Sequence, residues 1–398
     1  MISFEEAYKI VLDHAIEFGQ EVVPLAESHG RILAEKIYAD RDFPPFDRVT
    51  KDGIAIQCAA YAQGIRRFKI QGIAAAGSPQ QELEDVHSCI EVMTGAVLPK
   101  QADTVVMYEH LELHEGFATL QKEVKKHQNI HDQGSDESKG NLVLAEGTRI
   151  SSAHIGVLAS VGQHHLKVKT TPKIAVISTG NELVDVDQIP SPHQIRKSNS
   201  HTLKAALKLE NIDCKLLHFN DLKSDLELGL SEALEAFDVL LLSGGVSKGK
   251  YDFLPQTFEK LGVKRLFHRV GQRPGKPFWF GRHPDQQCIL FAFPGNPAST
   301  FANYHVYFIS WLHAALGLPS PNYQVVLQEA FENTTDLTRF IRASVNLTDG
   351  KIWANLVMGN GSGDLTSLTQ ANGFVRLEPL TTYEVGDRVP FYPTRRIL

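Results

Sequence analysis

The sequence lacks the features of a secreted or membrane-spanning protein. Its 398 residues include only four cysteines, none of them in a Cys-x-x-Cys pair. We therefore expect reduced core cysteines rather than a disulfide framework or a thiolate zinc site. No run of about eighteen apolar residues is present, and the first residues lack the basic and then apolar order of a secretory signal. These absences predict a cytoplasmic protein without a membrane span.

A basic excess is also missing. The chain holds 40 Lys and Arg residues against 46 Asp and Glu residues, which gives a formal net charge of −6. General binders of nucleic acids or anionic membranes need a basic surface, so we expect neither as a partner. Small acidic or phosphorylated substrates stay open, because a local basic pocket does not show in a net count.

The chain is too long for one ordinary core, and its patterns predict several domains. A capping box at Ser3 and Glu6 begins a helix, and a second helix is expected over 25–37. Short runs broken by glycine then predict strands, before a helix capped at Ser151 or Ser152. The predicted domains are a small helical linking domain (1–40 with 141–170), a β-rich insert domain (41–140), an α/β domain (171–318) and a C-terminal β domain (319–398).

The α/β domain has the clearest pattern. Apolar runs expected as strands (173–178, 214–219, 238–242, 288–293) alternate with helical periods (200–209, 225–236, 253–261, 298–316). Such alternation predicts βαβ units and a parallel sheet covered on both faces. The short alternating runs after residue 322 predict strands of a barrel-like β domain. The expected fold class is multidomain α/β with a central parallel-sheet domain.

Three glycine-containing turns follow three of the predicted parallel strands. In open parallel sheets, ligands bind outside the carboxyl ends of the strands, where glycine lets backbone N–H groups approach an anion. Together the turns favour a phosphate or oxyanion cleft. Neither Gly-x-Gly-x-x-Gly nor a Walker loop is present, which argues against nicotinamide and P-loop sites. The turns are Ser178-Thr179-Gly180-Asn181-Glu182, Ser243-Gly244-Gly245-Val246-Ser247 and Pro294-Gly295-Asn296-Pro297.

Charged residues stand near these turns. Glu182, Asp221 and Asp252 are acidic, and a hard cation such as Mg²⁺ takes carboxylate and phosphate oxygens. Asp221 alternatively fits a helix-capping role. Arg273 and Lys276 lie on a loop stiffened by two prolines and a glycine, which suits oxyanion binding at fixed geometry. Phosphate and molybdate are both tetrahedral oxyanions, so the residues alone leave both open.

At this point the ordered motifs carry a resemblance. The chain resembles the molybdopterin molybdenumtransferase (MoeA) family, with matches in order from about residue 3 to the end. The motifs that carry it are Pro44-Pro45-Phe46-Asp47 leading to Asp52-Gly53, Met93-Thr94-Gly95-Ala96, Ala102-Asp103-Thr104-Val105-Val106, Ser198-Asn199-Ser200, the three glycine turns and Pro274-Gly275-Lys276-Pro277.

The resemblance implies a homodimer with four domains per subunit. The family enzyme hydrolyses adenylylated molybdopterin in a Mg²⁺-dependent step, inserts molybdenum from molybdate and releases AMP and molybdenum cofactor. Its cleft joins the parallel-sheet domain of one subunit to the β insert of the other, so Asp52 and Thr94 would come from the partner. A transient contact with the adenylylating enzyme is a further expected partnership.

The resemblance also implies individual residue roles. The catalytic set would be Asp52, Thr94, Glu182, Asp221, Asp252 and Lys276, with Glu182, Asp221 and Asp252 around the metal. Molybdate would contact Arg273, Lys276 and Ser299. The substrate-binding set would be Gly180, Ser198, Ser243, Gly244, Gly245, Ser247, Arg273, Pro294, Gly295, Asn296, Ser299, Arg342 and Ser362.

The chain departs from the family pattern in three places. Val49-Thr50-Lys51 stands where Ser-Ala-Met is usual, Lys250 where an acid is common, and Arg273 where lysine is common. Arginine keeps the charge but changes the donor geometry. Two other functions remain open: a molybdopterin adenylyltransferase, which needs only the sheet domain, and an inactive scaffold with this fold.

Overall fold

The computed structural model describes residues 1–246, 253–320 and 322–395. The chain forms two compact units, which are described separately. The first contains Met1–Glu21, Gly30–Ile32 and Val168–Leu398, and the second contains Val22–His29 and Leu33–Lys167. The four domain boundaries predicted above remain a prediction. None of the described helices is long and apolar enough to cross a membrane.

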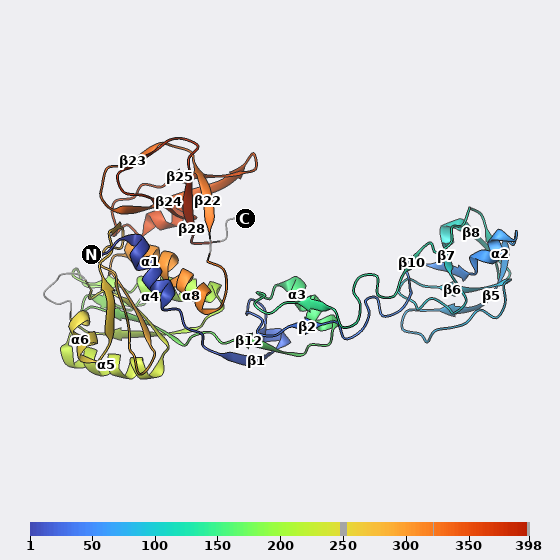
Figure 1. Ribbon diagram of the computed structural model, residues 1–398, viewed down its shortest axis with the longest axis horizontal. Helices are drawn as coiled ribbons and strands as arrows, with labels where there is room; N and C mark the ends of the chain where they lie inside the picture. Colours follow the sequence, from blue (N-terminus) through green and yellow to red (C-terminus); the bar gives the residue numbers. More distant parts are fainter. Residues whose placement is uncertain (247–252, 321, 396–398) are drawn as a thin grey trace. The chain divides into compact units, whose positions relative to one another are not determined.

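A six-stranded sheet forms the centre of the first unit (Figure 1). Its order is β16-β13-β17-β21-β20-β18, and the first four strands are parallel. The two strands at the other edge are antiparallel and were not predicted. The strands are β13 (Ile174–Thr179), β16 (Cys214–Phe219), β17 (Val239–Ser243), β18 (Lys264–His268), β20 (Trp279–Arg282) and β21 (Ile289–Phe293).

Helices cover both faces of this sheet, as predicted. Side chains alternate along β13, so Ile174 and Val176 join one buried cluster while Ala175 and Ile177 join another. The first cluster includes α1, α4, α7 and α8, and the second includes α5 and α6. The helices are α1 (Phe4–Asp13), α4 (Asn199–Leu209), α5 (Lys223–Ala236), α6 (Leu254–Lys260), α7 (Pro297–Asn303) and α8 (Ile309–Ala315), with a π-helical turn at Tyr304–Phe308.

Helix α1 packs its apolar face in the core of the parallel sheet, where Phe4 is buried. One expectation for the N-terminal segment is wrong, because the predicted helix over 25–37 is absent. That segment follows β1 (Gln20–Pro24), contains one 3₁₀ turn (Leu25–Glu27) and ends where β2 (Ile37–Tyr38) begins, because its backbone N–H groups pair with distant carbonyls instead of carbonyls four residues back.

The C-terminal segment closes into a five-stranded barrel. Strand β24 pairs with both β25 and β26, which completes the ring β24-β25-β22-β28-β26. A short strand of the α/β segment, β19 (Gln272–Arg273), adds in parallel to β24 and ties the barrel to the sheet domain. The ring strands are β22 (Tyr323–Leu327), β24 (Thr338–Thr348), β25 (Lys351–Leu356), β26 (Gly373–Leu377) and β28 (Arg388–Pro393), and β23 (Phe331–Asn333) pairs with β27 (Thr381–Tyr383) beside it.

The second unit contains the β-rich insert. Its six-stranded sheet has the order β7-β4-β6-β5-β9-β8. A 3₁₀ turn at Tyr108–His110 separates two of its strands, and Ser151 caps α3 (Ser152–Ser160) as expected. The sheet strands are β4 (Gly53–Ile56), β5 (Arg67–Ala74), β6 (Ser88–Val92), β7 (Thr104–Met107), β8 (Leu111–His114) and β9 (Phe117–Leu120).

Candidate active site

The three predicted glycine turns lie at one edge of the parallel sheet. Strands β13, β17 and β21 are neighbours, and their register pairs Ser178 with Ser243 and Ser243 with Phe293, so the turns begin at the same level. The turns also bond to one another, since the Gly244 N–H donates to the Phe293 carbonyl at 3.1 Å. This arrangement brings Gly180, Ser243, Gly244, Gly245, Pro294 and Gly295 to one edge, as predicted.

Asn199, rather than Ser198, connects these turns. Its Nδ2 donates to Ser243 Oγ at 2.8 Å and to the Gly295 carbonyl at 2.7 Å. Ser198 is the N-cap of α4 and makes no side-chain cap bond. The sequence placed Ser198-Asn199-Ser200 at this position but gave no sign of which side chain faces the turns. Asn199 is therefore a site residue that sequence reasoning missed.

Two of the predicted acidic residues stand on adjacent loops at the same edge. The Gly180 N–H donates to the Phe219 carbonyl at 3.4 Å, and the Asp221 N–H donates to Asn181 Oδ1 at 3.1 Å. The loops that carry Glu182 and Asp221 thus lie side by side. Two carboxylates suit a hard cation in donor type, but within the described residues no group of three metal-binding side chains gathers. Asp252 and Ser247 lie outside the described residues.

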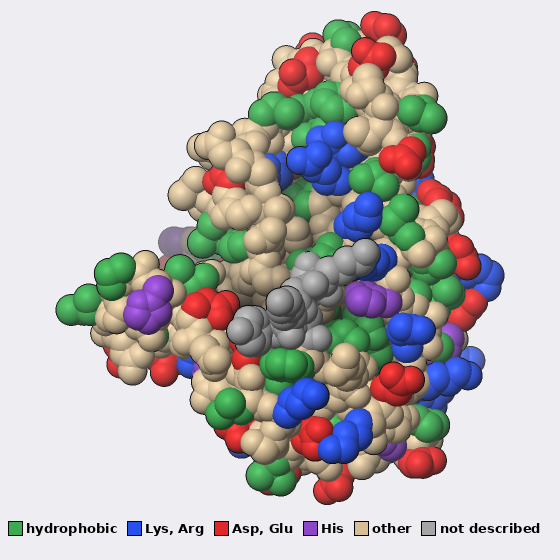
Figure 2. Space-filling model, turned by 90° about the vertical axis from the view of Figure 1, so that its left-hand side faces the viewer, with side chains coloured by type: hydrophobic (Ala, Val, Ile, Leu, Met, Phe, Trp, Pro, Cys, Tyr) green, Lys and Arg blue, Asp and Glu red, His purple; other side chains and the backbone are tan. Residues whose placement is uncertain are grey.

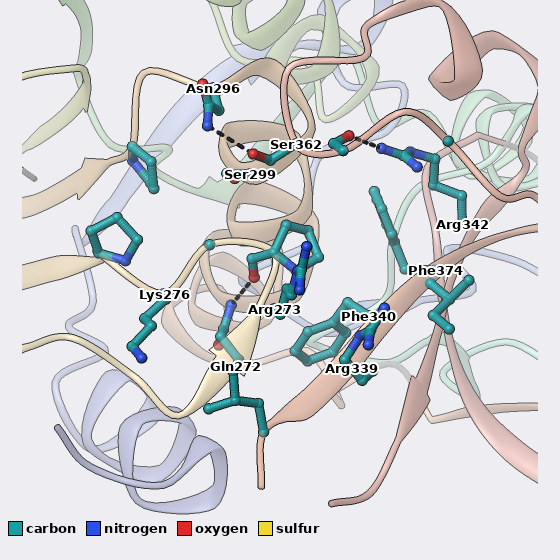
Figure 3. A pocket seen from close by; sticks show the side chains of 18 of the residues that line it. Gln272, Arg273, Lys276, Asn296, Ser299, Arg339, Phe340, Arg342, Ser362 and Phe374 are labelled. Carbon is teal, nitrogen blue, oxygen red and sulfur yellow. Dashed lines mark hydrogen bonds between the residues drawn. The ribbon is translucent and has the colours of Figure 1, made fainter. Parts of the chain in front are cut away.

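A cavity of about 510 Å³ lies between the α/β segment and the barrel (Figure 3). It brings together residues that are far apart in sequence, from β19 and its loop, the turn after β21, and strand β24 with the loop that follows β25. The predicted residues that line it are Arg273, Lys276, Pro294, Asn296, Ser299, Arg342 and Ser362.

Four cations line this cavity, and none of its described lining residues is acidic. They are Arg273, Lys276, Arg339 and Arg342. In Figure 3, Arg273 and Arg339 lie in the middle, with Arg342 towards one end and Lys276 towards the other. Figure 2 shows Lys and Arg side chains gathered along a hollow on this side of the molecule. Such a cavity attracts anions.

Arg339 was not predicted. It lies on β24 directly across from Arg273 on β19, and this parallel pairing places two guanidinium groups from different segments in one cavity. Burial lowers the pKa of Arg339, and the nearby charge of Arg273 lowers it further. The alternating runs after residue 322 predicted strands there, but that pattern did not single out Arg339. Recognising that the strand begins at Thr338 would have drawn attention to Arg339.

Polar contacts fix the barrel side of the cavity. Arg342 donates to the Gly361 carbonyl at 2.9 Å, and Asn296 Nδ2 donates to Ser362 Oγ at 2.7 Å. Asp364 anchors this loop by accepting from the N–H groups of Asn360 and Ser367, and these bonds lower the pKa of its carboxyl group. The turn after β21 therefore joins the row of glycine turns to the barrel.

The predicted acidic and basic groups do not line one common cavity. Neither Glu182 nor Asp221 lines the space that contains Lys276, and Asp252 lies outside the described residues. A continuous row of turns joins the two places, because Asn199 bridges Ser243 and Gly295. The arrangement suits an elongated anionic ligand with an oxyanion at one end.

Asp52 and Thr94 contact each other in the second compact unit. Both the N–H and the hydroxyl of Thr94 donate to Asp52 Oδ1, at 2.6 and 2.7 Å. The N–H bond is the main cause of a lowered Asp52 pKa. Neighbouring strands explain the pairing, since Gly53 of β4 is the register partner of Val92 of β6. Their place in a cleft shared between subunits remains a prediction.

Comparisons with known proteins agree with these features. Residues 2–162 match the MoeA N-terminal region (domain I and II), residues 175–314 a probable molybdopterin binding domain, and residues 324–394 the MoeA C-terminal region (domain IV). A molybdopterin molybdenumtransferase from Synechocystis sp. is 35% identical over 397 residues, covering 98% of this chain and all of that protein. One from Staphylococcus epidermidis is 34% identical over 390 residues, covering 94% and 91%.

A solved structure shows the same architecture. The crystal structure of a molybdopterin biosynthesis MoeA protein from Pyrococcus horikosii superposes with a TM-score of 0.82 at 28% identity, covering both chains fully. The multidomain α/β fold class is thereby confirmed. With matching domains along nearly its whole length and relatives above 30% identity, this chain belongs to the molybdopterin molybdenumtransferase (MoeA) family.

Proposed function

We propose that this chain is a transferase that inserts molybdenum from molybdate into molybdopterin, a step of molybdenum cofactor biosynthesis. Family membership supports the transfer itself. The finer proposal is that the organic substrate is adenylylated molybdopterin and that AMP leaves. The observation that carries it is the cavity with four cations beside the row of glycine turns.

The cations supply the oxyanion end of the site. Arginine guanidinium groups donate paired hydrogen bonds to tetrahedral oxyanions, and ammonium groups add point charge. Arg273 and Lys276 lie on the sheet side of the cavity, and Arg339 and Arg342 lie on the barrel side. Molybdate bound among them would be held at a fixed position relative to the substrate. Holding two reactants at fixed geometry supplies much of the rate of a transfer reaction.

The glycine turns supply the phosphate end. Strand-to-helix turns at the carboxyl edge of a parallel sheet present backbone N–H groups to an anion. Asn199 keeps two of the turns together, so the phosphates of an adenylylated substrate would meet a preformed surface. The dithiolene end would then extend along the row towards Asn296 and the cationic cavity.

Mg²⁺ belongs to the proposal as the cofactor. Glu182 and Asp221 would hold it, together with Asp252 and substrate phosphate oxygens, as suits a cation that keeps few protein ligands. Bound there, it would supply Lewis-acid polarisation of the adenylate phosphorus. Glu182 and Asp221 would orient it from adjacent loops, and Lys276 and Arg273 would compensate the charge of the incoming oxyanion.

The assembly and location are also part of the proposal. We expect a homodimer whose cleft takes Asp52 and Thr94 from the partner, in the cytoplasm, with a transient contact to the adenylylating enzyme. The hydrogen bonds from Thr94 leave Asp52 as a carboxylate of fixed orientation, which suits a site residue.

The test is release of AMP from adenylylated molybdopterin by purified protein, with and without molybdate and Mg²⁺. Release that depends on both supports the proposal. Adenylylation of free molybdopterin by ATP would support the adenylyltransferase alternative instead. No turnover, with substrate still bound, would point to an inactive scaffold.

A further inference from the structure

A buried polar network lies behind the loop that carries Arg273 and Lys276. Gln272, Asn303 and Tyr307 are all fully buried. Gln272 Nε2 donates to Asn303 Oδ1 at 2.8 Å and to the Pro274 carbonyl at 3.0 Å, and the Tyr307 hydroxyl donates to Gln272 Oε1. Both ends of the Gln272 amide are therefore bound.

The network also holds the loop backbone. Asn303 Nδ2 donates to the Gly275 carbonyl at 3.2 Å. Gly275 has a φ of +90°, and a Cβ added there would lie 2.2 Å from Asn303 Oδ1. Only glycine allows so close an approach. The fixed carbonyls of Pro274 and Gly275 lie between Arg273 and Lys276, so the network determines where both cations leave the loop.

The surroundings of this network are apolar. The Tyr307 ring packs at 5.8 Å from Phe4 and 4.9 Å from Phe278, measured between ring centroids. Buried polar groups are tolerated in such a place only when all are satisfied, and apolar side chains would pack there equally well. Tyr307 also lies in the π-helical turn, a rare geometry often found at functional sites. Packing alone does not account for this arrangement.

We propose that Gln272, Asn303 and Tyr307 are positioning residues that hold the Arg273–Lys276 loop in the geometry needed for oxyanion binding. This inference rests on the proposed function. Binding groups must be held within about 0.5 Å of the productive geometry by packed and hydrogen-bonded neighbours. Loosening the loop therefore weakens oxyanion binding without removing any charge from the cavity.

The chain offers a matched pair of substitutions on the same turn. Tyr307→Phe removes the hydroxyl that bonds Gln272. Tyr304→Phe removes the hydroxyl of another fully buried tyrosine, which has no hydrogen-bond partner within the described part of the chain. Both variants lose the same atom from the same helical turn, so the loss of a buried hydroxyl is common to both, whereas only Tyr307→Phe leaves Gln272 Oε1 without this donor.

The measurement is calorimetric titration of full-length protein with molybdate, followed by steady-state kinetics. We expect Tyr307→Phe to bind molybdate roughly tenfold more weakly, the loss of about one hydrogen bond, and Tyr304→Phe to bind as the wild type does. The KM for adenylylated molybdopterin should stay unchanged in both variants. If Tyr307 only stabilised the fold, Tyr307→Phe would not weaken molybdate binding while leaving the KM for adenylylated molybdopterin unchanged.

Equal molybdate affinity of wild type and Tyr307→Phe would overturn this inference alone. If Tyr307→Phe does not fold, Asn303→Ser replaces it, because this variant loses the bond to Gly275 while keeping a small polar group. Its expected result is the same selective loss, and unchanged affinity would again overturn the inference. Absence of molybdate binding to the wild type would overturn the proposed function as well.

Discussion

Replacing Arg339 by glutamine should weaken oxyanion binding without lowering the stability of the ligand-free protein. In the ligand-free protein, burial and the charge of Arg273 both disfavour the charged form of Arg339, as its lowered pKa records. Removing the charge should therefore leave the ligand-free protein as stable as before, or more stable. Oxyanion binding should suffer, because one of four cations in the cavity is lost.

The expected loss of molybdate affinity follows from the free energy that one charged hydrogen bond contributes. Such bonds contribute about 1.5–3 kcal/mol, so molybdate affinity should fall roughly 10- to 150-fold. A ligand present at about 100 times its Kd stabilises the folded state by about 2.7 kcal/mol. At the same molybdate concentration, a variant with tenfold weaker binding should gain only about half of that.

The assay is thermal unfolding with and without molybdate, combined with calorimetric titration. The matched control is Arg388→Gln, which removes an exposed arginine from the same barrel. We expect Arg388→Gln to keep the full molybdate-induced rise in Tm. The reasoning is refuted if Arg339→Gln also keeps the full molybdate-induced rise in Tm. It is refuted too if the free energy of unfolding of the ligand-free variant falls by as much as its free energy of molybdate binding.

Three further predictions concern other parts of the site. Asp364→Asn should lower the stability of the fold mainly above about pH 4, and the pH dependence of Tm tests this. The pKa of the Asp364 carboxyl in the folded protein lies below the usual 3.8, so the carboxylate stabilises the fold above that pH and loses this effect as the pH falls. Gly180→Ala should slow AMP release in folded protein, because a Cβ there would lie 2.5 Å from the Glu182 carboxylate, which must then move away, and φ is +137°. Mixing Asp52→Ala with Lys276→Ala chains should restore some activity, since in the proposed homodimer one of the two shared clefts would keep both residues.

Each of these predictions has a contrary outcome. A Tm of Asp364→Asn that tracks the wild type at every pH would show that the loop does not depend on the carboxylate. Gly64→Ala is the control for Gly180→Ala, because Gly64 also has positive φ but no atom within 4 Å of an added Cβ. If it loses as much activity, backbone strain alone is responsible. Mixed chains as inactive as their parents would exclude a shared cleft.

Local patterns predicted the elements that are marked by a continuous apolar run in the sequence. Three of the four parallel strands are fully buried apolar runs, and all four were expected within two residues of their observed ends. The glycine turns followed because the carboxyl ends of parallel strands must meet at one edge. The prediction of a helix over 25–37 was wrong. Its apolar residues have helical spacing, but the segment is extended and its backbone N–H groups pair with distant carbonyls. Periodicity does not report such long-range pairing.

The site was predictable to the same extent. Arg273 and Lys276 were expected from their stiff loop and Arg342 from the family resemblance, but Arg339 depends on β19 pairing with β24, strands 66 residues apart in register. Asn199 and the Gln272 network depend on side-chain direction, which composition and spacing do not encode. The missed residues are therefore those whose role arises from contacts between segments.

The charge arrangement of the cavity explains why such contacts are needed. Burial lowers the pKa of both Arg339 and Arg342; the charge of Arg273 lowers the pKa of Arg339 further, whereas the nearby Asp364 carboxylate opposes the shift at Arg342. Burial and the repulsion between Arg273 and Arg339 thus make the ligand-free cavity less stable than a neutral one would be. Hydrogen bonds from buried polar groups, together with the β19–β24 pairing, hold the cations in place against this repulsion. An oxyanion removes the repulsion, so the ligand itself should strengthen the contact between the sheet domain and the barrel.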